Sequence, residues 1–580
     1  MVTYYIGLAA TLHDSALAIL SPAGEVLFAE ATERSLQNKR AYNCPPDDLV
    51  RIPRLIKEWC EPGAELVVAV SWSRAYLNQL NMMSISSQSN LNANYWKEDE
   101  TAWPLPSPEA LAIGLRNSIS QAGLNLSSTW SISNPVTIRG YNHHLSHAAV
   151  AAFTSPFEEC VVAVVDGYGE MCSTSFFHFK KGSLYPLGEK SKHVGLSRAE
   201  TASLGFYYGR LCALCGFDPI KGEEWKVMGL APYGKHDPEL YALLKPLIRV
   251  NGLRLESGCS DEEALRRIRK LRSLARLPGA PPLEVADLAF TGQLVFEEIM
   301  ADLLTELYSY GLSDNLALAG GCALNSSWNG KIVASTGFEH LYVPSAPGDD
   351  GNAIGAAYLA WSEDHPNEFI SQGFQPPYLG SSLVGQSFEH LQRFSGLKID
   401  RDPHHLAERV SSLLEEGKII GWLQGRAEFG PRALGNRSIL ADPRPAHMKD
   451  RINDWVKFRE DFRPFAPSIL DEWGETYFED YQTSPYMERT LRWRPEVAGH
   501  VPSVVHIDGT GRLQSVRREW NPRFYDLLQA FYRRTGVPVL LNTSFNVMDK
   551  PITHSIEDAL GAFYTTGLDA LVIEDLLLEK

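Results

Sequence analysis

The sequence lacks the features of several large classes of protein. No apolar run reaches the ~18 residues that a membrane helix needs. The N-terminal segment has no basic stretch before its apolar part, so we expect a first β-strand there and not a signal peptide. Basic residues are outnumbered, since 54 Lys and Arg against 70 Asp and Glu give a formal net charge of −16. This balance disfavours a general nucleic-acid binder, which needs a basic surface to displace counterions.

Cysteines are few and scattered. Eight occur in 580 residues, and only Cys212 and Cys215 form a CxxC pair. A redox or zinc site would need a second pair or a thioredoxin-like context, and neither is present in the sequence. Two small core residues on one helix are therefore the simpler interpretation. The pattern is typical of a reduced cytoplasmic protein.

The chain is too long for a single hydrophobic core, so we expect at least two domains. Pro, Gly, Ser and Gln concentrate in residues 366–390, which predicts a linker. The resulting division places one domain in residues 1–365 and a second α/β domain in residues 391–580.

A strand, a polar loop and a hairpin occur twice in the first domain, about 150 residues apart. Two similar open sheets can face each other and hold a ligand between them, as in the actin, sugar kinase and Hsp70 superfamily; two unrelated hairpins are the alternative. The predicted strands are Tyr4–Ala9, Ala16–Leu20, Val26–Ala31, Cys160–Val165, Ser173–Phe179 and Ser183–Leu187.

Two histidines spaced four residues apart indicate a metal site. His143 and His147 would lie one turn apart on the same face of a helix. Alone, such a pair is more often two satisfied polar histidines. Here Asp166 follows a predicted strand and Asp349 stands in a Gly-rich loop, so both could add oxygen ligands. Mixed nitrogen and oxygen ligation favours iron, manganese or zinc over calcium.

Two Gly-rich loops predict a nucleotide cleft. Gly320 and Gly321 stand between a short apolar strand and a helical segment that includes Asn325. Gly348 opens a second loop before another helix. Glycines let the backbone approach phosphates, and a helix N-terminus attracts their charge.

Basic side chains concentrate in the C-terminal part of an otherwise acidic chain. Three arginines lie within residues 425–438, and Lys457, Arg459, Arg463 and Arg512 follow. Arginine offers forked donors for phosphate oxygens, and lysine a point charge. A set of surface salt bridges is the alternative, but the neighbouring Gly, Pro and Asn turns favour a small anion pocket.

Several long segments, in order, resemble the NodU/CmcH family of carbamoyltransferases, which includes antibiotic-tailoring O-carbamoyltransferases of the tobramycin type. The resemblance runs from His13 to the C-terminus. The segments are EWKVMGLAPYG at 224–234, GGCALN at 320–325, GPRALGNRSI at 430–439, HIDGTGR at 506–512 and NTSFN at 542–546. After the last segment, the chain has Met548, Asp549 and Lys550 where the family commonly has a glycine and an acidic residue.

The resemblance implies an N-terminal ASKHA domain of the Kae-like type and a C-terminal YrdC-like domain. It implies that carbamoyl phosphate and ATP, with magnesium, form carbamoyl adenylate in the second domain. The first domain would then transfer the carbamoyl group to an alcohol of a natural product, as in antibiotic biosynthesis. Iron is the metal that the resemblance favours, with manganese or zinc as alternatives.

The resemblance also implies the roles of individual residues. His13 would act as base or orienter of the hydroxyl, and Asp349 fits the ligand motif better than Asp350. The implied metal ligands are His143, His147, Asp166 and Asp349. The implied residues of the activation site are Arg432, Lys457, Met487, Arg512, Asn542 and Ser544.

Three other functions remain as alternatives. Both half-folds occur in tRNA threonylcarbamoyl enzymes, but the acidic charge argues against tRNA binding. A small-molecule kinase of the ASKHA type would leave the histidine pair and the basic segments without a role. A non-catalytic nucleotide-binding regulator would leave too many reactive groups unused. Residues 75–110 are a candidate acceptor-binding region, and neither the acceptor nor the oligomeric state follows from the sequence.

Overall fold

The chain is built from α-helices and β-sheets that form two units. The first unit contains residues 1–33, 40–324 and 332–375, and the second contains residues 34–39, 325–331 and 376–580. The computed structural model describes residues 2–85, 108–130, 135–188, 202–366, 368, 373–383, 386–394, 399–401, 403–547 and 549–580.

The first unit begins with a five-stranded sheet of order β3-β2-β1-β4-β5. Strand β1 is antiparallel to β2 and parallel to β4, which is parallel to β5. Strands β1, β2 and β4 are buried along almost their whole length and are mainly apolar, as expected for central strands covered on both faces. The strands are β1 (Thr3–Ala9), β2 (Ala16–Leu20), β3 (Val26–Ala31), β4 (Glu65–Val70) and β5 (Val136–Gly140).

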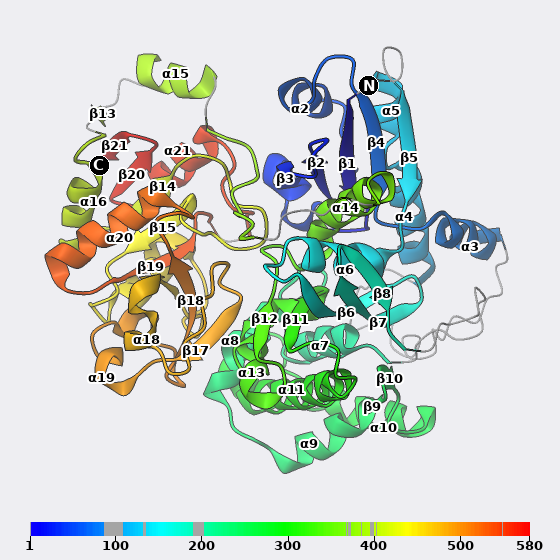
Figure 1. The fold of residues 1–580 in the computed structure, drawn as a ribbon. Helices are drawn as coiled ribbons and strands as arrows, with labels where there is room; N and C mark the ends of the chain where they lie inside the picture. Colours follow the sequence, from blue (N-terminus) through cyan, green and yellow to red (C-terminus); the bar gives the residue numbers. More distant parts are fainter. Residues whose placement is uncertain are drawn as a thin grey trace. The chain divides into compact units, whose positions relative to one another are not determined.

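A second sheet in the first unit repeats this topology, with order β12-β11-β6-β7-β8. Strand β6 is antiparallel to β7 and parallel to β11, as β1 is to β2 and β4 (Figure 1). The duplication predicted from the repeated strand pattern is therefore present. The strands are β6 (Glu159–Gly169), β7 (Cys172–Lys180), β8 (Ser183–Pro186), β11 (Asn315–Ala319) and β12 (His340–Tyr342).

Helices α6 and α14 pack against each other and against these sheets. Glycine makes the close approach possible: a Cβ on Gly7 of β1 would lie 1.7 Å from the Ala353 carbonyl oxygen of α14. The main helices of the unit are α2 (Ile52–Trp59), α3 (Arg74–Ile85), α4 (Pro108–Gln121), α5 (Leu124–Trp130), α6 (His143–Phe153), α7 (Leu204–Leu214), α8 (Glu224–Leu230), α9 (Pro238–Leu244), α10 (Asp261–Arg272), α11 (Ala286–Tyr308), α13 (Ile332–Ser335) and α14 (Asn352–Asp364). A short hairpin, β9 (Arg249–Asn251) and β10 (Arg254–Glu256), lies between α9 and α10.

The second unit has one mixed sheet of nine strands around an extensive apolar core. Its order is β13-β21-β20-β14-β15-β19-β16-β18-β17. The strands are β13 (Ile399–Arg401), β14 (Ile420–Leu423), β15 (Arg437–Ala441), β16 (Ala466–Leu470), β17 (Arg489–Arg492), β18 (Thr510–Val516), β19 (Val539–Ser544), β20 (Ala570–Ile573) and β21 (Leu576–Glu579).

Helices complete the second unit, and α20 packs on α16 and on the sheet. The helices are α12 (Ser326–Asn329), α15 (Gln386–Phe394), α16 (Leu406–Glu415), α17 (Met448–Ile452), α18 (Gly474–Tyr477), α19 (Pro495–Ala498), α20 (Pro522–Thr535) and α21 (Ile556–Thr565). Helix α1 (Thr32–Leu36) ends in the segment 34–39, where Arg34 donates to the Gly430 carbonyl at 2.7 Å. The α/β fold class expected from the sequence is confirmed, with a duplicated-sheet part followed by a C-terminal α/β part.

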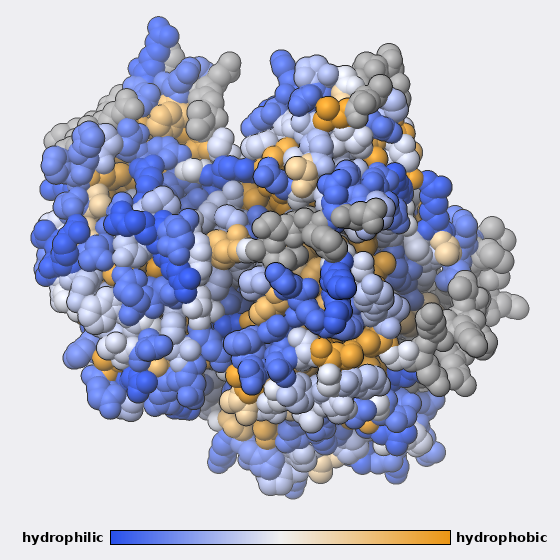
Figure 2. Space-filling model, viewed as in Figure 1, coloured by the Kyte–Doolittle hydropathy of each residue, from blue (hydrophilic) through white to orange (hydrophobic). Residues whose placement is uncertain are grey.

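The visible surface is largely hydrophilic, with hydrophobic residues in small groups (Figure 2). Within the described part of the chain, every helix is too short or too polar to cross a membrane.

Candidate functional site

The first candidate site is built on helix α6. The side chain of Asn142 caps the helix by accepting a hydrogen bond from the Leu145 amide at 3.0 Å. The helix then places His143 and His147 one turn apart, with ring centroids separated by 4.9 Å. Both imidazoles are buried.

Two carboxylates converge on these histidines. Asp349 Oδ1 lies 3.4 Å from His143 Nε2 and 3.3 Å from His147 Nε2, while Asp166 Oδ2 lies 3.8 Å from His143 Nε2. Together these residues offer four ligand atoms that all lie within 4.8 Å of one another. We call this group the His–Asp cluster.

The His–Asp cluster suits a divalent metal ion. Both ring nitrogens of His147 are buried and have no hydrogen-bond partner, although Asp349 lies close to one of them. Burial opposes a charged His143, but the neighbouring Asp166 and Asp349 outweigh it and raise the pKa of His143 to about 10. Two imidazole nitrogens with two carboxylate oxygens form a donor set that transition metals accept.

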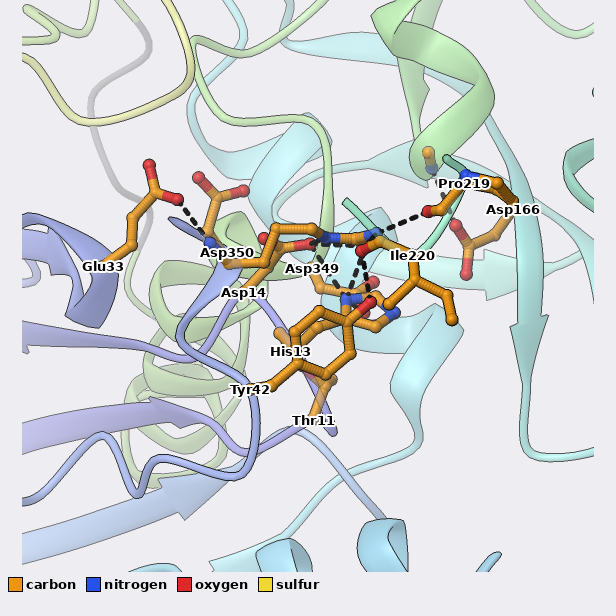
Figure 3. Close-up of polar contacts among 12 residues, drawn as sticks. Thr11, His13, Asp14, Glu33, Tyr42, Asp166, Pro219, Ile220, Asp349 and Asp350 are labelled. Carbon is orange, nitrogen blue, oxygen red and sulfur yellow. Dashed lines mark hydrogen bonds and ion pairs between the residues drawn. The ribbon is translucent and has the colours of Figure 1, made fainter. Parts of the chain in front are cut away.

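The two adjacent aspartates lie in different surroundings. Burial opposes the charge of Asp349, but the neighbouring imidazoles of His143 and His147 outweigh it and hold the pKa of Asp349 well below its usual range. Burial, Asp14 and Glu33 raise the pKa of Asp350 to about 7. Asp349 is the aspartate in the His–Asp cluster, and Figure 3 shows Asp350 beside Glu33.

His13 lies beside this cluster. Its Nδ1 is 3.8 Å from Asp349 Oδ2, so the Asp349 carboxylate turns one oxygen to His13 and the other to the two buried histidines. The same Nδ1 lies 2.9 Å from Asp14 Oδ2 (Figure 3). The imidazole side chain is one-third exposed. His13 is therefore the accessible group next to the His–Asp cluster.

The predicted Gly-rich loops flank the same cluster. Gly321 donates its amide to Asp166 Oδ1 at 2.7 Å. Gly320 has a φ of 91°, and a Cβ there would lie 2.4 Å from the Val165 carbonyl oxygen, so glycine is required. The Gly320 amide donates to the Pro347 carbonyl at 2.9 Å, which joins this loop to the one containing Gly348.

The second candidate site, in the second unit, gathers basic side chains. Lys457 is buried and donates to Asn546 Oδ1 at 2.6 Å and to the Ser544 carbonyl. Ser544 ends β19, and its hydroxyl lies 3.3 Å from the Lys457 amine. Burial, then the charges of Arg459 and Arg463, hold the pKa of Lys457 well below its usual range.

Arg512 on β18 extends this group. Burial, followed by the charges of Arg432, Arg459 and Arg463, holds the pKa of Arg512 well below its usual range. Burial also lowers the pKa of Arg432 to about 10. The Arg512 Nε and one terminal nitrogen of Arg459 are buried without a hydrogen-bond partner. We call Arg432, Lys457, Arg459, Arg463 and Arg512 the cationic cluster, which suits an anionic ligand.

Comparison with known proteins identifies the family. The profile described as Carbamoyltransferase N-terminus matches residues 121–358, and that described as Carbamoyltransferase C-terminus matches residues 411–580. Nodulation protein NolNO of Sinorhizobium fredii is 34% identical over 98% of this chain and 79% of its own. The chain belongs to the NodU/CmcH carbamoyltransferase family.

One more relative and one solved structure are also similar to the chain. Nodulation protein NolO of Bradyrhizobium diazoefficiens is 38% identical to this carbamoyltransferase over 76% of the chain and 79% of its own length. The solved structure of full-length HypF in its phosphate- and nucleotide-bound form has a TM-score of 0.36 and 13% identity, covering 64% of this chain and 56% of HypF.

Two further predicted residues of the carbamoyltransferase, Asn325 and Asn542, have hydrogen bonds within the second unit. Asn325 belongs to the second unit, where its side chain caps α12, whereas Gly320, Gly321 and Gly348 belong to the first. Asn542 is fully buried and donates to the Ala433 carbonyl at 3.2 Å, next to Arg432.

Two arginines that the sequence grouped with the anion pocket have structural partners. Arg426 donates to the carbonyl oxygens of Gly380 and Leu379. The fully buried Arg437 donates to carbonyl oxygens of four residues: Ser381, Gln424, Gly425 and Asn436. Met487, which the resemblance placed in the activation site, is buried in a left-handed turn with a φ of 57°.

Some of the predicted segments lie outside the described residues. They are residues 86–107 of the predicted acceptor region, residues 367, 369–372 and 384–385 of the predicted linker, and Met548.

Sequence reasoning missed two polar residues. Arg40 contacts both His13 and Asp14. Glu170, at a φ of 50°, accepts hydrogen bonds from the backbone amides of Ser73 and His143 at 2.7 and 3.1 Å and from side chains on the same segments. Neither residue lies in a motif, and their partners are distant in the sequence, so no local pattern marks them.

Proposed function

We propose that this carbamoyltransferase is an ATP-dependent O-carbamoyltransferase that makes carbamoyl adenylate and passes the carbamoyl group to an alcohol. The observation that carries the proposal is that each of the two family domains contains one polar cluster and that the two clusters differ in charge. The cationic cluster lies within the C-terminal match, and the His–Asp cluster lies within the N-terminal match.

The cationic cluster would serve the activation step. Arg432, Arg512 and the Ser544 hydroxyl would hold the phosphate of carbamoyl phosphate, and Lys457 would add a charge at the same place. Water would cleave carbamoyl phosphate to carbamate and phosphate. A carbamate oxygen would then attack the α-phosphorus of ATP and displace pyrophosphate. The products of this stage are carbamoyl adenylate, phosphate and pyrophosphate.

His13 and the His–Asp cluster would serve the transfer step. The acceptor oxygen would attack the carbamoyl carbon, the bond from that carbon to the AMP oxygen would break, and AMP would leave. His13 would accept the alcohol proton, because its accessible imidazole lies beside Asp349. A divalent metal, with iron the first expectation, would neutralise phosphate charge when bound by His143, His147, Asp166 and Asp349.

The proposal also includes that the adenylate is kept away from water and that the acceptor is a small molecule. A mixed anhydride hydrolyses in water, so it requires a dry site. The buried His–Asp cluster supports such an environment. We propose the hydroxyl of a natural product as acceptor, as in secondary-metabolite or antibiotic biosynthesis, and a cytoplasmic location.

The direct test is incubation of the full chain with ATP and carbamoyl phosphate, with pyrophosphate and AMP measured by mass spectrometry. Pyrophosphate should form only when carbamoyl phosphate is present. His13→Asn should preserve the first release of pyrophosphate and block carbamoyl transfer. Transfer of phosphate from ATP to an alcohol without carbamoyl phosphate would instead indicate a kinase.

A further inference from the structure

Arg40 joins three segments of the first unit around His13. Its Nε and Nη2 lie 3.1 and 2.9 Å from Asp14 Oδ2, and Nη2 is also 2.9 Å from His13 Nδ1. Nη1 donates to the carbonyl oxygens of Pro219 and Ile220, both at 3.1 Å. Every nitrogen of the guanidinium group therefore has a partner, and these partners come from two segments far from Arg40 in the sequence.

The backbone around this contact is unusual. Asp14, Arg40, Ala41 and Asn43 have φ values of 55°, 61°, 40° and 55°, in a region that residues other than glycine seldom adopt. The Asp14 amide donates to the Arg40 carbonyl at 2.7 Å, which joins the two strained segments directly. Such conformations cost energy and are concentrated at functional sites, so an observed cluster suggests a functional constraint.

The loop at residues 219–222, which contacts Arg40, makes further contacts with the same site. Tyr42 donates its hydroxyl to the Ile220 carbonyl at 2.6 Å, and its ring lies edge-on to His13 at 5.7 Å. Gly222 has a φ of 67°, and a Cβ there would lie 3.1 Å from Arg40 Cδ. The segment leads directly into α8, which contains the family motif that the proposed chemistry does not otherwise use.

We propose that Arg40 is a positioning residue that orients His13 through Asp14 for carbamoyl transfer. Carboxylate is the stronger partner for both N–H groups because these hydrogen bonds are charge-assisted. Arg40 has only donors, so His13 Nδ1 either accepts from Arg40 Nη2 or carries a proton that it donates to Asp14 Oδ2. The proposal is the second tautomer, in which Asp14 Oδ2 accepts from both Arg40 and His13 and the imidazole Nε2 is left as the proton acceptor. This inference rests on the proposed function, because it assigns Arg40 to the transfer step and not to activation.

The alternative is that Arg40 only holds the loop at 219–220 in place. A purely structural role predicts that Arg40→Ala lowers stability and slows both steps together. A positioning role predicts a selective loss of transfer, because a small displacement of a catalytic base costs as much as about 100-fold in rate.

The two roles separate in a single-turnover experiment with the full chain, metal, ATP and carbamoyl phosphate, and with glycerol as the surrogate acceptor. Pyrophosphate release reports activation, and AMP release with O-carbamoylglycerol formation reports transfer. In Arg40→Ala, the single-turnover rate constant of transfer at saturating glycerol should fall about 10- to 100-fold. The rate constant of pyrophosphate release and the glycerol concentration that gives half the maximal transfer rate should each stay within about twofold of wild type.

Two further variants keep the test decisive. Arg40→Lys retains a charge for Asp14 but cannot also bind both carbonyls, so it should recover part of the transfer rate. Arg51→Lys is the matched control, because Arg51 forms a buried ion pair with Glu30 in the same unit, 3.0 Å apart, and it should transfer at the wild-type rate. Equal loss of pyrophosphate and AMP release in both Arg40 variants would overturn the proposal.

A spectroscopic measurement tests the orientation without any substrate. In protein labelled with ¹⁵N-histidine, the signal absent from His13→Gln identifies His13. Wild type should show the proton on Nδ1, and Arg40→Ala should lose this single tautomer. An unchanged tautomer in Arg40→Ala would overturn the inference even if the proposed function stands. Failure of wild type to release pyrophosphate would refute the proposed function, while the tautomer comparison would still decide the role of Arg40.

Discussion

The two polar clusters are organised by opposite electrostatic principles. In the His–Asp cluster, carboxylates face imidazoles, so each charge has a partner of the other sign. In the cationic cluster, the buried Lys457 and the partly buried arginines interact with one another, and the repulsion between their like charges adds to the cost of burial. Among the described residues, Arg463 alone of these side chains forms an ion pair, with Glu460 at 3.2 Å. The difference indicates a cation site in the first unit and a site in the second that an anion would stabilise.

The clusters also differ in the structures that hold them. Helix α6 supplies both histidines, strand β6 supplies Asp166, and a short 3-10 turn before α14 supplies Asp349. The basic residues come mainly from turns and irregular segments, including the π-helical turn Asn453–Lys457 that precedes the left-handed Phe458. Regular secondary structure therefore holds the side chains of the His–Asp cluster in place. The side chains of the cationic cluster should become more ordered when an anionic ligand binds.

The largest expected effect is the loss of metal from His147→Ala. Removal of one of four ligands should weaken metal binding by at least about 100-fold, because even outer-sphere partners change affinity by about 10- to 100-fold. Metal content after dialysis and a competition titration with a chromogenic chelator measure this. His144→Gln is the control, since His144 is buried beside the cluster but its Nδ1 contacts Ser175 Oγ at 2.8 Å. Equal metal loss in both variants would contradict the assigned ligand set.

Arg512→Ala should affect the other cluster alone. Loss of a charge-assisted contact costs about 1.5–3 kcal/mol, or about 10- to 150-fold in carbamoyl phosphate-dependent pyrophosphate release. Metal content should remain at the wild-type value. Arg517→Ala, which removes an ion pair with Asp471 near the end of the same strand, is the control and should release pyrophosphate normally. A strong defect in Arg517→Ala with little in Arg512→Ala would reverse the assignment.

The smallest expected effect is a pH dependence that originates at Lys457. Its folded-state pKa lies well below the unfolded value of 10.5 because burial and nearby arginines oppose its charge. Between these two pKa values the unfolded chain binds more protons, so the free energy of unfolding should rise with pH. Inorganic phosphate should reduce this rise, because an anion favours the charged amine.

Lys457→Met should show a flatter pH dependence of unfolding, measured with urea across that interval. Lys418→Met is the control, because Lys418 is much more exposed and lies 3.7 Å from Asp569. A slope that is the same in wild type and Lys457→Met would show that Lys457 does not carry the effect.

The parts of the protein that follow local rules were predictable. The repeated strands of the first unit were expected within a few residues of their observed bounds, since strand periodicity and turn residues are local signals. His143 and His147 were expected on one helical face because helix geometry determines that spacing. Asp166 and Asp349 were proposed as further ligands from their places after a predicted strand and in a Gly-rich loop, and the family resemblance implied the same set. The structure brings both next to the histidines.

The rest depended on contacts between distant segments. Arg426, Arg432 and Arg437 lie within one short motif, yet Arg426 and Arg437 bind backbone carbonyls while Arg432 interacts electrostatically with Arg512. Arg40 and Glu170 are inconspicuous in the sequence because their partners are brought to them by folding. The local sequence does not specify which hydrogen bonds each guanidinium or carboxylate group makes, because the partners come from distant segments.

The sequence by itself determined the family, the duplicated α/β architecture and the residue types available for metal and anion binding, because these follow from periodicity and from motifs of fixed spacing. Only the tertiary structure decided which charges meet: Asp349 between His13 and the buried histidines, Arg40 on Asp14, and Arg512 among other cations. The physical reason is that burial and electrostatic pairing act over a few ångströms in space, whatever the separation along the chain.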